Sequence, residues 1–348
     1  MELVELRSEE LSAVIDPGRG ADVLSLIDRR TNTELLFSTP WRLRADAIRR
    51  GEAHPTSLGS AARWLEQYRG GWQTLCPNAG PERVDRGAPY GFHGEASTVP
   101  WTVKHRGAAA LTTSVELFTA PVRIVRQVTV DGATLFQTDR ITNLSRHDVR
   151  IDYSSHPAFG DGLLGRGAII STDARTFVVD DEETQDGVVP GSRHSWPWLR
   201  TNDRPRDMRI VPPSPEVASL FGWLTDFDRG RVSIAAAAGI TVHLLWDAKV
   251  LPFAWVWQEL QSSSGFPWFG RARVMAIEPA STPTSGPGRA QSLEIAAGQS
   301  VRVEVTLNVQ SIAAASEEEH PGHASTVGPA TTVGTPTRNV GLGESDAH

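Results

Sequence analysis

Apolar and polar residues alternate along many short stretches of this chain, and Gly, Pro, Asp or Asn residues separate one stretch from the next. A period of two residues places the apolar side chains on one face of a β-strand, so each stretch predicts a strand. The Asp131-Gly132 pair between two of these stretches is typical of a hairpin turn. The predicted strands cover residues 21–27, 111–118, 123–130, 135–142, 149–153, 208–211, 232–236, 240–246, 252–257, 271–277 and 301–309.

The helical pattern is weak in comparison. Residues 58–68 are the best helix candidate. Residues 41–50 follow a helix-start signal, Thr39-Pro40, but their apolar positions alternate as in a strand, so this stretch stays ambiguous. No sequence repeat of about 20 to 50 residues occurs, which disfavours solenoids and propellers. The pattern therefore predicts an all-β fold, a large antiparallel β-sandwich that forms a single domain over residues 1–312.

Residues 313–348 differ in composition from the rest of the chain. They are rich in Ala, Ser, Thr, Gly and Pro, carry a run of three glutamates and contain no aromatic residue. Such a segment buries too little apolar surface to offset the entropy lost on ordering. We predict a disordered C-terminal tail without a catalytic role.

Charge and composition exclude several classes of protein. Among the 348 residues, 34 Lys and Arg face 41 Asp and Glu, and the scattered basic residues argue against a nucleic-acid partner. Lys104 and Lys249 are the only lysines and lie outside any motif, which argues against most lysine-dependent chemistry such as Schiff bases. Cys76 is the only cysteine, so an intrachain disulfide is excluded. The sequence shows no signal peptide and no apolar run of about 18 residues. We predict a soluble, cytoplasmic protein that does not bind membranes.

Three short segments place one ionisable residue among aromatic, Gly or Pro neighbours. Glu278 comes at the end of an apolar strand before a proline, where partial desolvation raises a carboxyl pKa toward useful base strength. His156 precedes Pro157, which we expect to hold a turn rigid and to aim the imidazole. His93 lies beside Gly94, which permits close approach of a ligand. The alternatives are an arginine partner for Glu278 and structural hydrogen bonds for the two histidines.

Other motifs are absent or ambiguous. The spacing of the two histidines and the glutamate matches no local metal motif, so we predict no metal, although a site built from distant strands stays open. Nucleophile-elbow, P-loop and dinucleotide motifs are missing. Eleven tryptophans accompany only three tyrosines, and indole faces suit the C–H faces of sugars. For Trp255 and Trp257, which share one strand face, a position in the core is the better interpretation.

Taken together, these motifs resemble those of the aldose 1-epimerase (galactose mutarotase-like) family, from about Gly18 to Val309. The resemblance rests on the order and spacing of five segments. These are Leu75-Cys76-Pro77-Asn78-Ala79-Gly80, Gly91-Phe92-His93-Gly94, Asn143-Leu144-Ser145, His156-Pro157-Ala158-Phe159-Gly160 and Ile277-Glu278-Pro279.

The resemblance implies a β-supersandwich that binds a monosaccharide without a cofactor and interconverts its α and β anomers. Glu278 matches the base that takes the anomeric proton, His156 the acid that protonates the ring oxygen, and His93 a sugar-binding histidine. Asp247 matches a hydroxyl-binding aspartate. Since the arginine that other members carry directly after the glycine is missing here, either Arg83 or Asn78 replaces it. We expect the acid and the base on opposite sides of the anomeric carbon.

Two other functions stay open. One is a carbohydrate-binding module that keeps the sandwich but lacks catalysis. The other is a lyase or hydrolase on the same fold, which would need a second acidic or tyrosine group, with Glu95, Asp161 and Tyr153 as candidates. The sequence does not identify the sugar, its phosphorylation or the oligomeric state.

Overall fold

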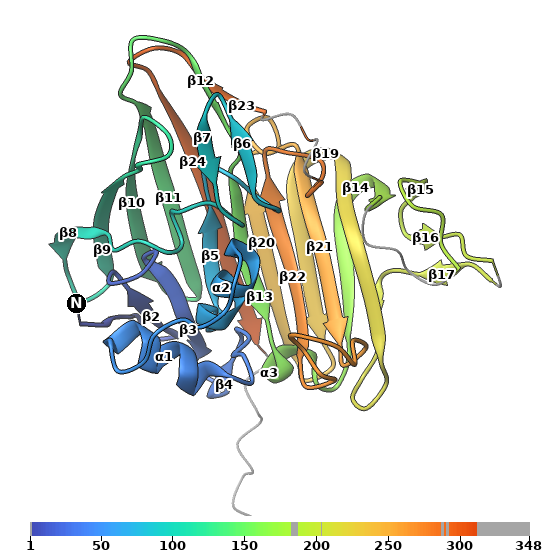
Figure 1. The fold of residues 1–348 in the computed structure, drawn as a ribbon. Coiled ribbons are helices and arrows are strands. Elements are labelled where there is room, and N and C mark those ends of the chain that lie inside the picture. The colour runs from blue at the N-terminus through green and yellow to red at the C-terminus, as the bar shows by residue number, and fades with distance from the viewer. Residues whose placement is uncertain (1, 182–186, 203, 287–288, 290–291, 312–348) are drawn as a thin grey trace, which may run out of the picture. The chain divides into compact units, whose positions relative to one another are not determined.

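Alternating burial along the strands builds two antiparallel layers that pack face to face (Figure 1). The computed structural model describes residues 2–181, 187–202, 204–286, 289 and 292–311. The all-β prediction is confirmed. The predicted tail, residues 313–348, lies outside the described residues. Among those described, no helix is both long and apolar enough to cross a membrane.

The strands pair in one continuous order through both layers. The first layer contains β8 (Thr102–Arg106), β9 (Ala110–Glu116), β10 (Val122–Asp131), β11 (Thr134–Asn143), β24 (Ser300–Ser311) and β20 (Ile240–Trp246). The second layer contains β1 (Val4–Arg7), β2 (Leu11–Asp16), β3 (Asp22–Asp28), β5 (Trp72–Leu75), β13 (Ser154–Phe159), β22 (Arg273–Ala280) and β21 (Phe253–Leu260).

Two long strands join the layers. The first half of β19 (Ala218–Ala236) pairs with β21 and its second half pairs with β20, while β14 (Ala168–Val179) pairs with β19 along both halves. A register shift in β14 between Thr172 and Ala174 marks the change from one layer to the other. Of β14 and β19, the sequence pattern predicted only residues 232–236, at the end of β19. The first half of β19 mixes polar and aromatic residues without clear alternation.

Short strands and helices complete the structure. The remaining strands are β4 (Thr33–Glu34), β6 (Arg83–Asp85), β7 (Ala88–Tyr90), β12 (Val149–Ile151), β15 (Arg193–Ser195), β16 (Trp198–Leu199), β17 (Arg206–Asp207), β18 (Ile210–Val211) and β23 (Leu293–Ile295). The helices are α1 (Arg42–Arg50), α2 (Ser60–Gln67) and α3 (Asp161–Leu164). Helix α2 confirms the helix prediction at 58–68, and α1 shows that the ambiguous stretch 41–50 is helical.

Apart from β1, the strands of the second layer are largely buried on both faces. On β22, Met275 and Ile277 enter the core between the layers, whereas Val274 and Ala276 belong to a second apolar cluster with Trp64 of α2. Two-sided burial explains the continuous apolar run at residues 274–277 of β22. It also explains a wrong expectation: His156-Pro157 is not in a turn but within β13, and Pro279 does not end β22.

A buried ion pair connects the two layers. Arg126 on β10 donates two hydrogen bonds to Asp139 on β11, at 2.8 and 2.6 Å, and its guanidinium lies 4.7 Å from the ring centre of Trp101. Tyr153 also donates to Asp139, at 2.8 Å, and Arg126 donates to Thr74 on β5 of the other layer. Complete hydrogen bonding lets these charges remain buried between the layers.

We expect Arg126→Met to lower the free energy of unfolding by about 3–5 kcal/mol, because it leaves Asp139 buried without its cation. Arg123→Met on the same strand is the matched control. Arg123 pairs with Glu116 in solvent, where such a pair contributes about 0–1 kcal/mol. Urea denaturation of both variants measures the difference, and equal losses would contradict the role given to Arg126.

Candidate active site

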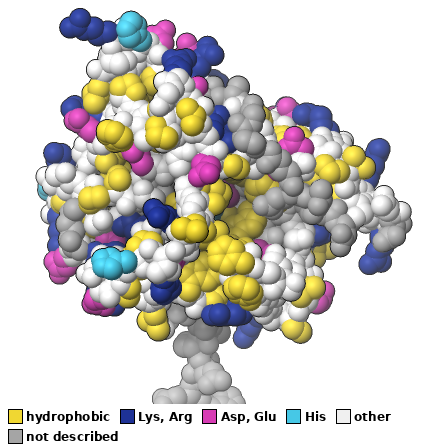
Figure 2. All heavy atoms as spheres, in the orientation of Figure 1, with side chains coloured by type: hydrophobic (Ala, Val, Ile, Leu, Met, Phe, Trp, Pro, Cys, Tyr) yellow, Lys and Arg dark blue, Asp and Glu magenta, His cyan; other side chains and the backbone are white. Residues whose placement is uncertain are grey.

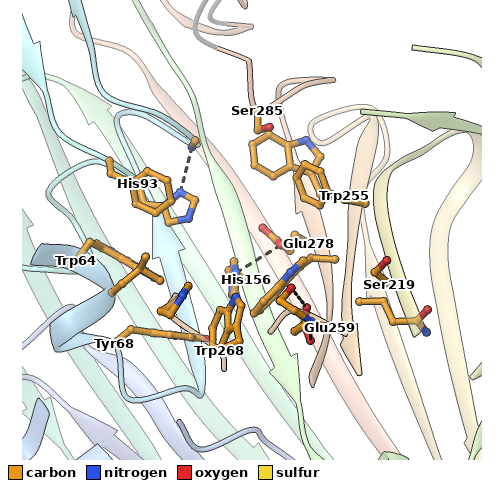
Figure 3. A pocket seen from close by; sticks show the side chains of 18 of the residues that line it. Trp64, Tyr68, His93, His156, Ser219, Trp255, Glu259, Trp268, Glu278 and Ser285 are labelled. Carbon is orange, nitrogen blue, oxygen red and sulfur yellow. Dashed lines mark hydrogen bonds and ion pairs between the residues drawn. The ribbon is translucent and has the colours of Figure 1, made fainter. Parts of the chain in front are cut away.

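Glu278 and His156 lie opposite one another on adjacent strands of the second layer. The register pairs Ser154 with Ala280 and Ala158 with Ala276, which sets His156 of β13 against Glu278 of β22. Their side chains meet at 3.4 Å, between His156 Nε2 and Glu278 Oε1 (Figure 3). Both residues are almost completely buried. Register therefore brings together two groups that are more than a hundred residues apart in the chain.

Burial determines the protonation of this pair. It raises the pKa of Glu278 well above 4.5 and lowers the pKa of His156 to about 4. Both shifts favour the neutral forms, in which the carboxyl group carries a proton and one nitrogen of the imidazole can accept one. Among the described residues, Glu278 Oε2 and His156 Nδ1 are buried and have no hydrogen-bond partner. The pair is thus less completely hydrogen-bonded than the Arg126–Asp139 pair.

His93 reaches the same pocket from a loop. The His93 Nδ1 accepts a hydrogen bond from the Gly80 N–H at 3.0 Å, and the backbone N–H of His93 donates to the Gly80 carbonyl at 2.9 Å. Burial lowers its pKa well below 6.5, so the ring is neutral and its proton is on Nε2. Gly94 holds this loop in place with φ +70°, because a Cβ there would lie 2.4 Å from the Cys76 carbonyl oxygen. His93 thus brings an N–H donor to the pocket.

Aromatic rings form much of the wall around these groups. Trp64 and Tyr68 come from α2 and its C-terminal end, Trp255 and Trp257 from β21, and Trp268 from the loop after β21 (Figure 3). Figure 2 shows hydrophobic side chains around a hollow in this face of the molecule. The cavity has a volume of about 610 Å³. The interpretation of Trp255 and Trp257 as core residues was incomplete, because both also line the pocket.

Three predicted sugar-binding residues lie elsewhere. The Asn78 amide donates to the carbonyls of Pro81 and Gly91, and its oxygen accepts from Arg289. These bonds hold the backbone of the loop that carries His93. Arg83 donates to the Arg289 carbonyl and pairs with Asp152 at 3.4 Å.

Asp247 lies in the turn after β20, where its carboxylate accepts from the Lys249 N–H. The described pocket lining contains none of these three side chains. The structure therefore brings together Glu278, His156 and His93, but not Asn78, Arg83 or Asp247.

The sequence interpretation missed the wall that α2 and the loop after β21 provide. Trp64 and Tyr68 are four residues apart on a helix end and stack at 4.7 Å, a spacing that the sequence offered as a signal. Trp268 lies 5.1 Å from Trp257, and nothing in the local sequence indicated that contact. No group of three or more His, Cys, Asp or Glu suited to a metal ion occurs within the described part of the chain.

The comparisons with known proteins agree with this architecture. Residues 1–309 match the model of a family described as a domain of unknown function, DUF4432. The chain belongs to this family. No curated protein matches this DUF4432 chain.

Solved structures with a similar fold include the Slr1438 protein from Synechocystis sp. PCC 6803, with a TM-score of 0.64 at 18% identity over 89% of this chain and 96% of that one. A galactose mutarotase related enzyme from Lactobacillus acidophilus gives 0.60 at 15% identity, covering 89% and 98%. A galactose mutarotase-like protein from Lactobacillus casei gives 0.60 at 14%, covering 89% and 100%. These likenesses confirm the galactose mutarotase-like fold and carry no conclusion about activity.

We expect Glu278→Gln to raise the melting temperature relative to the wild-type protein at pH 8 but not at pH 4. In the unfolded chain Glu278 ionises near pH 4.5, whereas the folded protein keeps it neutral to higher pH, so the wild type loses stability as pH rises above 4.5. Glutamine ionises in neither state. Thermal denaturation across this pH range measures the growing difference.

Glu5→Gln supplies a control of opposite sign. Hydrogen bonds from Arg7 and Ser12 lower the pKa of Glu5, so its carboxylate stabilises the folded state above pH 4.5 and this contribution disappears as pH falls. That variant should lose a small amount of stability at pH 8. A pH-independent difference for Glu278→Gln would contradict the burial of a neutral carboxyl group.

Proposed function

We propose that this protein is an aldose 1-epimerase, an isomerase that interconverts the α and β anomers of a monosaccharide without a cofactor. The observation that carries the proposal is the buried contact between Glu278 and His156 at the bottom of an aromatic pocket. Mutarotation needs one proton acceptor and one proton donor that exchange roles, and in the neutral pair the carboxyl group carries a proton that the imidazole can accept. The fold shared with galactose mutarotase-like proteins supports the same function.

The chemistry follows from the position of the shared proton. Transfer of the Glu278 proton to His156 Nε2 across the 3.4 Å contact gives a carboxylate base and an imidazolium acid. Glu278 then accepts the proton of the anomeric hydroxyl while His156 donates its proton to the ring oxygen. The bond from C1 to the ring oxygen breaks, its electron pair stays on that oxygen, and C1 becomes an aldehyde carbon. Rotation about C1–C2 and the reverse proton transfers close the ring on the other face.

The close contact of the two groups suits this reaction better than the opposite-side arrangement expected from the sequence. The anomeric hydroxyl oxygen and the ring oxygen are bonded to the same carbon atom. An acid and a base that lie side by side can therefore contact both oxygens at once, while the N–H of His93 supplies a further hydrogen bond.

Burial of the pair favours an enzyme over a carbohydrate-binding module. A module needs donors and acceptors for hydroxyl groups, and exposed side chains supply them at little cost. A buried carboxyl group with an unpartnered oxygen reduces stability, which is expected where that group serves a reaction.

We expect the wild-type protein to accelerate anomer exchange of at least one aldose, measured by polarimetry or NMR exchange in dilute buffer. Glu278→Gln should lower kcat by about a hundredfold or more and leave sugar binding nearly intact, because an amide cannot accept the proton. His156→Asn should have the same effect.

Glu116→Gln is the control, because Glu116 is an exposed carboxylate on β9 outside the pocket lining, and kcat should be unchanged. Binding without acceleration across hexoses, pentoses and deoxysugars would favour the carbohydrate-binding module. Near wild-type turnover of Glu278→Gln would show that the base has been assigned to the wrong residue.

A further inference from the structure

The polar groups of the pocket wall away from Glu278 and His156 are largely occupied by partners within the protein. The two oxygens of Glu259 accept four hydrogen bonds: Oε1 from the N–H groups of Ser262 (2.6 Å) and Ser263 (3.1 Å), and Oε2 from their hydroxyls (2.8 and 2.5 Å). A carboxylate has about four acceptor sites, so this one has no remaining capacity for a ligand. Glu259 holds the loop that carries Trp268 and does not serve to bind a hydroxyl group.

The same holds at other points of the wall. Gln258 Oε1 accepts from Arg206 at 2.9 Å, and the Ser285 hydroxyl donates to Asp180 at 3.2 Å. The described lining leaves for a ligand the N–H of His93, the Glu278–His156 pair, the amide nitrogen of Gln258, the hydroxyls of Ser219 and Tyr68, and the indole N–H groups of Trp257 and Trp268.

Indole rings cover much of the surface between these groups. Trp257 lies 6.2 Å from the His156 ring and 5.1 Å from Trp268, and Trp64 lies 4.7 Å from His93, all measured between ring centres. A hydroxyl group placed against these faces would lose its hydrogen bonds to water and gain none. A methyl or methylene group in the same place would gain apolar contact.

The wall also offers no counter-charge for an anion. None of the described lining residues is a lysine or arginine, while two are glutamates. Outside the described residues the chain contains one lysine or arginine, Arg338. A phosphate or carboxylate on the sugar would be desolvated beside Glu278 without a cation.

We propose that the substrate is an uncharged sugar with few hydroxyl groups, a deoxysugar, whose reduced carbons lie against the indole faces of Trp257 and Trp268. This inference rests on the proposed function and narrows it to a substrate class. His93 and the Glu278–His156 pair hold the anomeric end, which every aldose presents, and the aromatic wall selects for missing hydroxyls elsewhere on the ring.

The experiment compares matched sugars on the wild-type protein by NMR anomer exchange. The pairs are D-galactose with 6-deoxy-D-galactose, and D-glucose with its 6-deoxy and 2-deoxy forms, with D-glucose 6-phosphate as the anionic member. We expect kcat/KM for at least one deoxysugar to exceed that of its parent by about 10- to 100-fold, the range in which an apolar pocket discriminates against a hydroxyl. The phosphate ester should be the poorest substrate.

Trp268→Ala should reduce this ratio toward one, because it removes an indole face from the wall. Trp198→Ala is the matched control: Trp198 is about half exposed on β16, outside the pocket lining, and the ratio should be unchanged. Equal or faster turnover of the parent sugars, or efficient turnover of the phosphate ester, would overturn the deoxysugar proposal and leave the epimerase proposal intact.

Absence of turnover with every sugar would overturn the epimerase proposal instead. Binding of the same sugars, followed by quenching of tryptophan fluorescence, then decides the present inference. Tighter binding of the deoxysugars would support it, and equal binding or none would overturn it.

Discussion

The register between β13 and β22 is the constraint on which the rest of the site depends. A strand exposes alternate residues on opposite faces, so a slip of one strand by one residue would turn either His156 or Glu278 into the core between the layers and leave the two side chains on opposite faces. The two-sided burial of these strands prevents such a slip, because Phe159, Met275 and Ile277 fill the core on the other side. The packing that stabilises the sandwich therefore also fixes the contact between the two titratable groups.

The two buried pairs of ionisable groups differ in how completely the protein hydrogen-bonds them. Arg126 and Asp139 are fully hydrogen-bonded, with help from Tyr153 and Trp101, and connect the layers as a charged pair. Glu278 and His156 retain unpartnered atoms, and burial favours their neutral forms. A fully satisfied network holds structure, whereas a partly satisfied one keeps a proton that can move.

The sequence was sufficient to predict the outer strands and to select three residues that the fold brings into one pocket. Regular alternation is visible in β10, β11, β20 and β24, which face a core on one side and solvent on the other. The alternation is absent from β13, because its residues are buried on both faces, and Pro157 within this strand suggested a turn. It is also absent from β14 and β19, because these strands pass from one layer to the other partway along their length. Local pattern does not report such tertiary constraints.

The same limit applies to the candidate site. Glu278, His156 and His93 stand next to prolines or glycines that mark them in the sequence, whereas Asn78, Arg83 and Asp247 are polar residues whose partners only the fold reveals. Arg289 shows the difficulty. It occupies Asn78 and contacts Asp152 at 3.0 Å, so the buried polar groups near the His93 loop satisfy one another instead of a ligand. Sequence spacing cannot distinguish a hydrogen bond within the protein from one to a substrate.

The elements that carry the chemistry differ from those that shape the pocket. Glu278 and His156 are on central strands, where neighbouring strands hold the backbone on both sides. The pocket wall comes instead from segments outside the central strands. Trp64 lies on α2, Tyr68 at the C-terminal end of that helix, and Trp268 on the loop after β21. Glu259 ties that loop to the end of β21 through its four hydrogen bonds. Changes in these segments can alter which sugar fits without moving the proton-carrying pair, so this architecture separates the reaction from the choice of substrate.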